Sequence, residues 1–132
     1  MTKKKLNEEN IKDVILDIKN EKITGINVTV PFKKSVISFI DELSFEARET
    51  QSVNTIYKRN NKVVGHNTDI SGFELAVRRK GYNIKDKNVF ILGAGGVVSS
   101  LIIALRKMGA AKIVLSNRTK KKAESLKKLF LI

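Results

Sequence analysis

Residues 88–98 read NVFILGAGGVV, an apolar run that gives way at once to a cluster of glycines. The apolar part, residues 88–92, predicts a short strand of the kind that parallel sheets bury on both faces. Residues 99–108 then carry a helical pattern that ends at Gly109, and a second apolar strand over 112–116 precedes a helix over 119–132. This order of strand, helix, strand and helix predicts a Rossmann-like α/β unit that begins near residue 87.

The glycine cluster lies where the first of these strands meets its helix, and it consists of Gly93, Ala94, Gly95 and Gly96. Glycines let the backbone turn tightly and approach a pyrophosphate, which then meets the N–H groups at the helix N-terminus. Val98 stands at a third position that is usually small, so we expect looser packing of helix on strand. A glycine-rich turn without a ligand is the alternative, but the strand–turn–helix context favours a dinucleotide site.

The end of the second strand bears on which dinucleotide is bound. NAD-binding units usually carry an acidic residue about 20 residues after the glycines, which binds the ribose 2′-hydroxyl. This sequence has Ser116, Asn117, Arg118 and Thr119 there, with no carboxylate. An arginine would instead pair with a 2′-phosphate, and Lys122 follows one helical turn later, so the residues favour NADP(H). A solvated arginine at a helix start is the alternative.

The residues before 87 predict a second lobe of mixed α/β structure. Residues 8–20 have apolar side chains at helical spacing, with Asn7 as a possible N-cap and Leu6 placed to contact Ile11. We place this lobe over residues 1–68, a connecting helix and linker over 69–86, and the Rossmann-like unit over 87–132. The other elements expected here are a strand over 23–30 with Ile26, Val28 and Val30 on one face, short helices over 33–40 and 44–50 with Asp41 between them, a hairpin of strands over 52–58 and 62–65 that turns at 59–61, and a helix over 69–80 that stops at Gly81.

Composition narrows the classes of function. The chain has 132 residues, 42% of them hydrophobic, and no cysteine, which excludes disulfides and thiolate metal sites. We assign no metal site. The net charge of +13 suggests a nucleic-acid-binding module, but no aromatic residues are interleaved with the lysine clusters, so a solvated basic surface is the preferred interpretation. No apolar run approaches ~18 residues, and no secretory signal is visible. We therefore predict a cytoplasmic protein without membrane or nucleic-acid partners.

Three groups of motifs then agree with one family. GINVTVPFK at 25–33, SVNT at 52–55 with GHNTD at 65–69, and GAGG at 93–96 followed by SNRT at 116–119 resemble the shikimate dehydrogenase family, in the same order. The resemblance covers residues 23–130. It implies a two-lobed α/β enzyme that reversibly reduces 3-dehydroshikimate to shikimate with NADPH, in aromatic amino-acid biosynthesis. A quinate/shikimate dehydrogenase relative that uses NAD is an alternative, against which the missing carboxylate after Ser116 argues.

The resemblance also implies roles for individual residues. Lys33 and Asp69 match the catalytic pair, which also binds substrate hydroxyls, and a lysine suits the reaction because reducing a ketone requires a proton donor to the developing alkoxide. Alone, Lys33 could be a surface lysine and Asp69 an N-cap. His66, the single histidine, is interpreted as a surface or hydrogen-bonded side chain. The remaining matches are Thr29 and Asn54 for substrate, Gly93, Ala94, Gly95 and Gly96 for the phosphates, and Asn117, Arg118, Thr119 and Lys122 around the 2′-phosphate.

The sequence also departs from the family pattern. Nothing like the family's serine motif, roughly G-x-P-x-x-H-S-x-S-P, occurs before Lys3, and the family continues well past Ile132. We therefore expect an incomplete substrate lobe followed by a truncated NADP-binding βαβα unit, weakly active or inactive alone. Such a chain could form a homodimer or pair with a complementary segment. A non-catalytic nucleotide-binding remnant is the alternative from another class of function.

Overall fold

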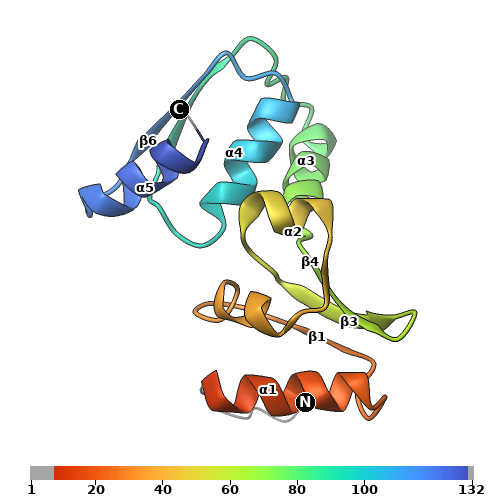
Figure 1. Cartoon of the computed structure of the whole chain (residues 1–132). Helices are drawn as coiled ribbons and strands as arrows, with labels where there is room; N and C mark the ends of the chain where they lie inside the picture. Colours follow the sequence, from red (N-terminus) through yellow and green to blue (C-terminus); the bar gives the residue numbers. More distant parts are fainter. Residues whose placement is uncertain (1–7, 131–132) are drawn as a thin grey trace. The chain divides into compact units, whose positions relative to one another are not determined.

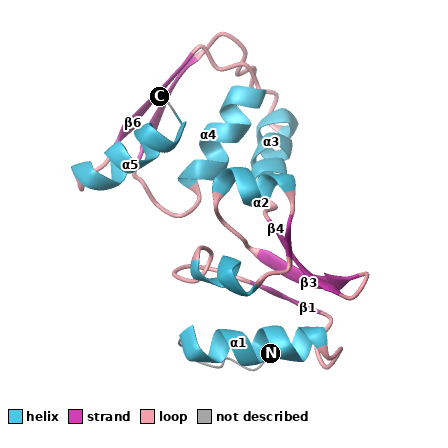
Figure 2. Ribbon diagram, viewed as in Figure 1, coloured by secondary structure: helices cyan, strands magenta, loops and turns pink. Residues whose placement is uncertain are grey.

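The computed structural model describes residues 8–130, which form two compact units, one up to Thr68 and one from Asp69 onward. Predictions for Leu6, Asn7 and residues 131–132 lie outside the described residues. Among those described, no helix is both long and apolar enough to cross a membrane. In the first unit the elements are α1 (Glu8–Lys19), β1 (Gly25–Asn27), the 3-10 helix η1 (Ser35–Phe39), β2 (Glu42–Leu43), α2 (Phe45–Thr50), β3 (Thr55–Arg59) and β4 (Lys62–His66); in the second they are α3 (Asp69–Arg79), β5 (Asn88–Leu92), α4 (Val98–Lys107), β6 (Lys112–Ser116) and α5 (Lys120–Phe130) (Figures 1 and 2).

The first unit is built on a four-stranded sheet in the order β1-β3-β4-β2. Strands β3 and β4 form the predicted hairpin, which turns through Asn60 and Asn61 with φ angles of 49° and 62°. Positive φ at both central residues is what a tight two-residue hairpin turn requires, and asparagine tolerates it well. β1 pairs antiparallel with β3, and β2 pairs parallel with β4.

Helix α1 contributes to the core of the first unit through side chains at helical spacing. Ile11, Ile15 and Ile18 are buried and belong to one cluster with residues of the sheet, among them Ile56 and Val63. The helix closes with Glu21 in the left-handed region at φ 61°, while the N–H of Lys22 donates to the carbonyl of Asp17 at 2.9 Å. The amphipathic pattern thus forms the predicted helix, although a residue other than glycine closes it.

The second unit contains the predicted strand–helix–strand–helix order. β5 and β6 pair in parallel from Asn88 opposite Lys112 to Leu92 opposite Ser116. One face of this sheet packs on α4 and on part of α5, in a cluster centred on Ile91, Ile102 and Leu105. Both α3 and α4 end at glycines with positive φ, as their sequences predict. Gly81 has a φ of 72° and Gly109 a φ of 80°. At both ends, the N–H of the glycine donates to the carbonyl of the residue three positions earlier, and the N–H of the following residue donates to the carbonyl five positions before it.

Several sequence expectations are wrong in detail. The strand predicted over 23–30 spans only residues 25–27, because the chain enters a turn at Val30, a residue that is 66% exposed. The peptide bond between Val30 and Pro31 is cis. The helix expected over 33–40 is the shorter 3-10 helix η1, and the two-residue strand β2 was not predicted. The prediction that β5 is buried on both faces is also wrong. Phe90 and Leu92 are 59% and 79% exposed, because α4 covers only the opposite face of the strand.

Candidate functional site

In the first unit, backbone hydrogen bonds hold the segment with Thr29 and Lys33 against the segment with Asn54. The N–H of Val28 donates to the carbonyl of Asn54 at 2.8 Å, and the N–H of Val53 donates to the carbonyl of Lys33 at the same distance. Between them the chain reverses, with Phe32 donating to the carbonyl of Thr29 at 2.9 Å. The segment from Thr29 to Lys33 is therefore fixed at both ends against the segment that carries Asn54.

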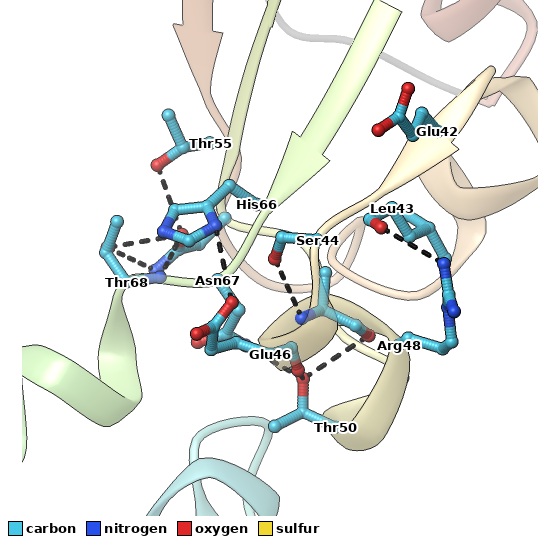
Figure 3. A network of polar contacts seen from close by, with 12 residues as sticks. Glu42, Leu43, Ser44, Glu46, Arg48, Thr50, Thr55, His66, Asn67 and Thr68 are labelled. Atoms are coloured by element: carbon cyan, nitrogen blue, oxygen red, sulfur yellow. Dashed lines mark hydrogen bonds and ion pairs between the residues drawn. The ribbon is translucent and has the colours of Figure 1, made fainter.

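The side chain of Asn54 lies in a polar network at the end of β4. Its Oδ1 accepts from the N–H of Thr68 at 3.0 Å and from the hydroxyl of Thr55 at 3.1 Å, and its Nδ2 donates to Oγ1 of Thr68 at 3.0 Å. Its own N–H donates to the carbonyl of His66 at 3.0 Å. The labelled side chains of Thr55, His66 and Thr68 belong to the network drawn in Figure 3. Sequence reasoning missed Thr68, although it belongs to the GHNTD motif.

A second part of this network is buried and anchors the segment between β4 and α3. Asn67 is fully buried, and its Nδ2 donates to Oγ1 of Thr50 at 3.1 Å and to the carbonyl of Ser52 at 2.9 Å. Nδ1 of His66 lies 3.8 Å from a carboxylate oxygen of Glu46, and both side chains are about one-third exposed (Figure 3). The network thus ties α2 to the segment that precedes Asp69, and the histidine ring lies near a carboxylate of that helix.

Asp69 is the first residue of α3 and lies in the second unit, whereas Lys33 lies in the first. Their action as a catalytic pair stays a prediction from the family resemblance. Among residues 8–130, no group of three or more histidine, aspartate and glutamate side chains is placed to hold a metal ion.

The glycine loop of the second unit follows β5 and leads into α4. Gly93 has a φ of 108°, a conformation that favours glycine, and its N–H donates to the carbonyl of Ser116 at 2.7 Å. The N–H of Ala94 donates to Oδ1 of Asn117 at 3.1 Å, and Nδ2 of Asn117 donates to the carbonyl of Thr119 at 2.8 Å. Asn117 therefore links the loop to the chain that leads into α5.

The space above the glycine loop suits a phosphate group. A Cβ atom added to Gly93 or Gly95 would have no atom of the described residues within 4 Å, so both glycines border open space. The loop leads to the N-terminus of α4, where the first-turn N–H groups of a helix have no partner within it. The residues present therefore fit the pyrophosphate of a dinucleotide.

The start of α5 is strongly basic. Arg118 and Lys122 are exposed, and the first turn of the helix contains lysines and no acidic residue. Cations at a helix N-terminus are unfavourable because they face the positive end of the helix dipole. A bound anion would relieve this repulsion, which makes the arrangement suitable for a phosphate group at the end of β6.

One unit has a parallel strand pair joined through a glycine loop and a helix, and the other has mixed α/β structure. Together they define a two-unit nucleotide-binding α/β protein. Residues 1–56 match the model of the shikimate dehydrogenase substrate binding domain, and residues 74–131 match the model of shikimate/quinate 5-dehydrogenase. The chain belongs to the shikimate dehydrogenase family.

Named relatives agree with this assignment. The shikimate dehydrogenase (NADP(+)) of Pelagibacter ubique is 59% identical over 125 residues, which cover 95% of this chain and 47% of that protein. The crystal structure of shikimate dehydrogenase from Aquifex aeolicus is 41% identical, with a TM-score of 0.87 over 96% of this chain and 47% of that one. The Thermus thermophilus enzyme in complex with NADP(H) and shikimate is 29% identical, with a TM-score of 0.84 over 96% and 48%. The chain spans about half the length of these relatives.

Proposed function

We propose that this chain carries the catalytic lysine–aspartate pair and the cofactor phosphate loop of an NADP-dependent shikimate dehydrogenase. The observation that carries the proposal is the glycine loop, which follows a parallel strand, borders open space at Gly93 and Gly95, and leads into a helix. Family membership supplies the substrate: the reaction is the reversible reduction of 3-dehydroshikimate to shikimate.

In the proposed mechanism, the glycine loop at Gly93 to Gly96 and the basic residues Arg118 and Lys122 would hold NADPH, which when bound would supply the hydride for the ketone carbon. Lys33 gives a proton to the oxygen of that carbon as negative charge develops there, so the product is a hydroxyl group. Asp69 accepts a hydrogen bond from a substrate hydroxyl and orients the ring. Thr29 and Asn54 are proposed to hold further substrate oxygens, because the segments that carry them are hydrogen-bonded to each other and to that of Lys33.

Nucleotide preference tests the cofactor part of the proposal. We expect the chain to bind NADP⁺ more tightly than NAD⁺ in a calorimetric titration, since Arg118 and Lys122 offer charge-assisted hydrogen bonds to a 2′-phosphate. Arg118→Ala should weaken NADP⁺ binding by roughly tenfold to a hundredfold, the equivalent of one charged hydrogen bond, and leave NAD⁺ binding unchanged. Lys127→Ala, an exposed lysine later in α5, is the matched control. Equal loss of both nucleotides on Arg118→Ala would contradict the assignment.

Turnover tests the catalytic part. Any shikimate-dependent reduction of NADP⁺ by the chain, which is expected to be weak, should be lost on Lys33→Ala and retained on Lys34→Ala, which removes the neighbouring exposed lysine; absorbance measures it. Binding of both ligands without any turnover by the unaltered chain would favour the alternative of a nucleotide-binding role, whereas full turnover would contradict the expectation that the chain is weakly active or inactive alone.

The cytoplasmic location and the oligomeric state also belong to this proposal. A biosynthetic dehydrogenase that draws on NADPH fits the cytoplasm, and the predicted homodimer, or pairing with a complementary segment, would be recognised by its mass in light scattering. A monodisperse monomer at micromolar concentration would reject the homodimer.

A further inference from the structure

Lysines and arginines gather at one end of the second unit, opposite to the end that carries the glycine loop. Helices α3 and α4 finish there and strands β5 and β6 begin there, as Figure 1 shows. Backbone hydrogen bonds join these segments: the N–H of Asp86 donates to the carbonyl of Gly109 at 2.8 Å, and the N–H of Ala111 donates to the carbonyl of Lys87 at 2.9 Å. This basic end consists of the exposed residues Arg78, Arg79, Lys80, Lys85, Lys87, Lys107 and Lys112.

The basic end has almost no negative charge beside it. Asp86 is the only acidic residue in the sequence from 75 to 123. Within the described residues, no carboxylate forms an ion pair with a member of the basic end. In the first unit, by contrast, Lys58 pairs with Glu21 at 2.7 Å. The positive charge of the basic end is therefore uncompensated by the chain's own carboxylates.

Helix stability accounts for only part of this charge. The cations in the last turns of α3 and α4 face the negative ends of the two helix dipoles, which stabilises them. Lys85, Lys87 and Lys112 lie outside both helices, so they gain little from either dipole. Cations that are close together repel one another. A bound partner with negative charge would relieve this repulsion.

An exposed aromatic ring bears on the kind of partner. Tyr82 follows α3 within the basic end and is 67% exposed. Tyrosine and arginine are the side chains that contribute most often to binding between proteins. A single-stranded nucleic acid would require several rings on which successive bases stack, and Tyr82 is the only aromatic residue in the segments 78–87 and 106–112. A protein partner therefore fits the basic end better than a nucleic acid does.

We propose that the basic end is a docking surface for an acidic segment of another protein. Carboxylates of that segment pair with Lys85, Lys87 and Lys112, and an apolar side chain of the partner packs on Tyr82. A second copy of this chain does not fit, because it brings the same positive charge. The proposal goes beyond the proposed function and does not depend on it, since the glycine loop follows the opposite, carboxyl end of β5.

An acidic peptide tests the docking surface in the full 132-residue chain. We expect a fluorescent oligoglutamate peptide to bind at low salt, as measured by anisotropy, and to dissociate as salt is added. The triple variant Lys85→Gln, Lys87→Gln and Lys112→Gln should weaken binding about tenfold, the combined effect of three exposed ion pairs. Its affinity for NADP⁺ should be unchanged.

The matched control removes the same amount of charge from exposed lysines elsewhere, through Lys12→Gln, Lys34→Gln and Lys127→Gln. It should weaken binding of the peptide only slightly. A second measurement needs no variant: in ¹⁵N–¹H NMR of the unaltered chain, the peptide should shift the backbone signals of residues 78–87 and 106–112 and leave those of residues 93–97 in place.

Four outcomes would overturn the proposal. Equal weakening in the two triple variants would show that net charge alone attracts the peptide. Absence of binding at low salt would show a solvated basic surface without a partner. Tighter binding of a single-stranded oligothymidylate than of the peptide would assign the basic end to nucleic acid. Loss of NADP⁺ affinity in the Lys85, Lys87 and Lys112 variant would assign these lysines to the nucleotide site.

Discussion

The same substitution, glycine to alanine, is expected to have opposite effects at two positions of this chain. Gly65 lies in β4, and a Cβ atom added there would be 2.9 Å from Cγ2 of Val53, 3.1 Å from Cδ2 of Leu43 and 3.2 Å from Cγ2 of Ile40. Three side-chain atoms would have to move, and Val53 is itself fully buried. Overpacking of a filled core costs about 1–3 kcal/mol, so Gly65→Ala should destabilise the first unit by that amount.

Gly72 is the matched control. It lies in α3, is exposed, and an added Cβ would have no described atom within 4 Å. Alanine in a helix is favoured over glycine by roughly 0.5–1 kcal/mol, since glycine loses more backbone freedom on folding. Gly72→Ala should therefore stabilise the second unit, although it adds the same methyl group.

Urea unfolding followed by far-ultraviolet circular dichroism measures both effects. With m values of about 1–3 kcal/mol/M for small proteins, Gly65→Ala should lower the midpoint by about 1 M and Gly72→Ala should raise it by a few tenths. If the two units unfold in separate transitions, Gly65→Ala should move one and Gly72→Ala the other. An unchanged midpoint in Gly65→Ala would refute the packing argument, because it would mean that the three neighbours yield without cost.

Three further results are expected. Ser44→Ala should cost about 1 kcal/mol in urea unfolding, because the Ser44 hydroxyl accepts the N–H of Ala47 at the start of α2 at 3.2 Å. The pKa of Asp41 is lowered, first by the N–H of Val63 and then by Lys19. Its contribution to stability is therefore present above its unfolded pKa and lost as the pH falls below about 4; unfolding measured against pH should lose part of this acid dependence in Asp41→Asn. Gly95→Ala places a methyl group in the open space above the loop, so calorimetry should show NADP⁺ binding at least roughly tenfold weaker with the unfolding midpoint unchanged.

Features set by local chemistry could be predicted from the sequence. The helix ends at Gly81 and Gly109 and the hairpin turn at Asn60 and Asn61 follow from residues that tolerate positive φ. The parallel strand pair β5–β6 follows from two apolar runs that are separated by enough residues for the helical connection that parallel strands require. These elements need only neighbouring residues to form, so their signal is contained in a short stretch of sequence.

Features set by tertiary partners could not be predicted in the same way. Strand β2 has only two residues and exists through its parallel pairing with β4. The apolar run of β5 shows that both faces could be buried, but not what covers each one, and Phe90 and Leu92 are exposed. Thr68 was missed in the site because its contact with Asn54 joins residues 14 positions apart.

Lys58 links two elements that are distant in sequence. Its Nζ donates to the carbonyl of Lys19 at the end of α1 at 3.0 Å and to a carboxylate oxygen of Glu21 at 2.7 Å, and its side chain is only 19% exposed. Ile18 of α1 also belongs to the hydrophobic core of the first unit. The helix therefore cannot detach without breaking the hydrogen bonds of Lys58 and exposing that core. Helix α1 and the hairpin should therefore open as one cooperative unit, with similar free energies of opening for their slowest backbone amides in native-state hydrogen exchange.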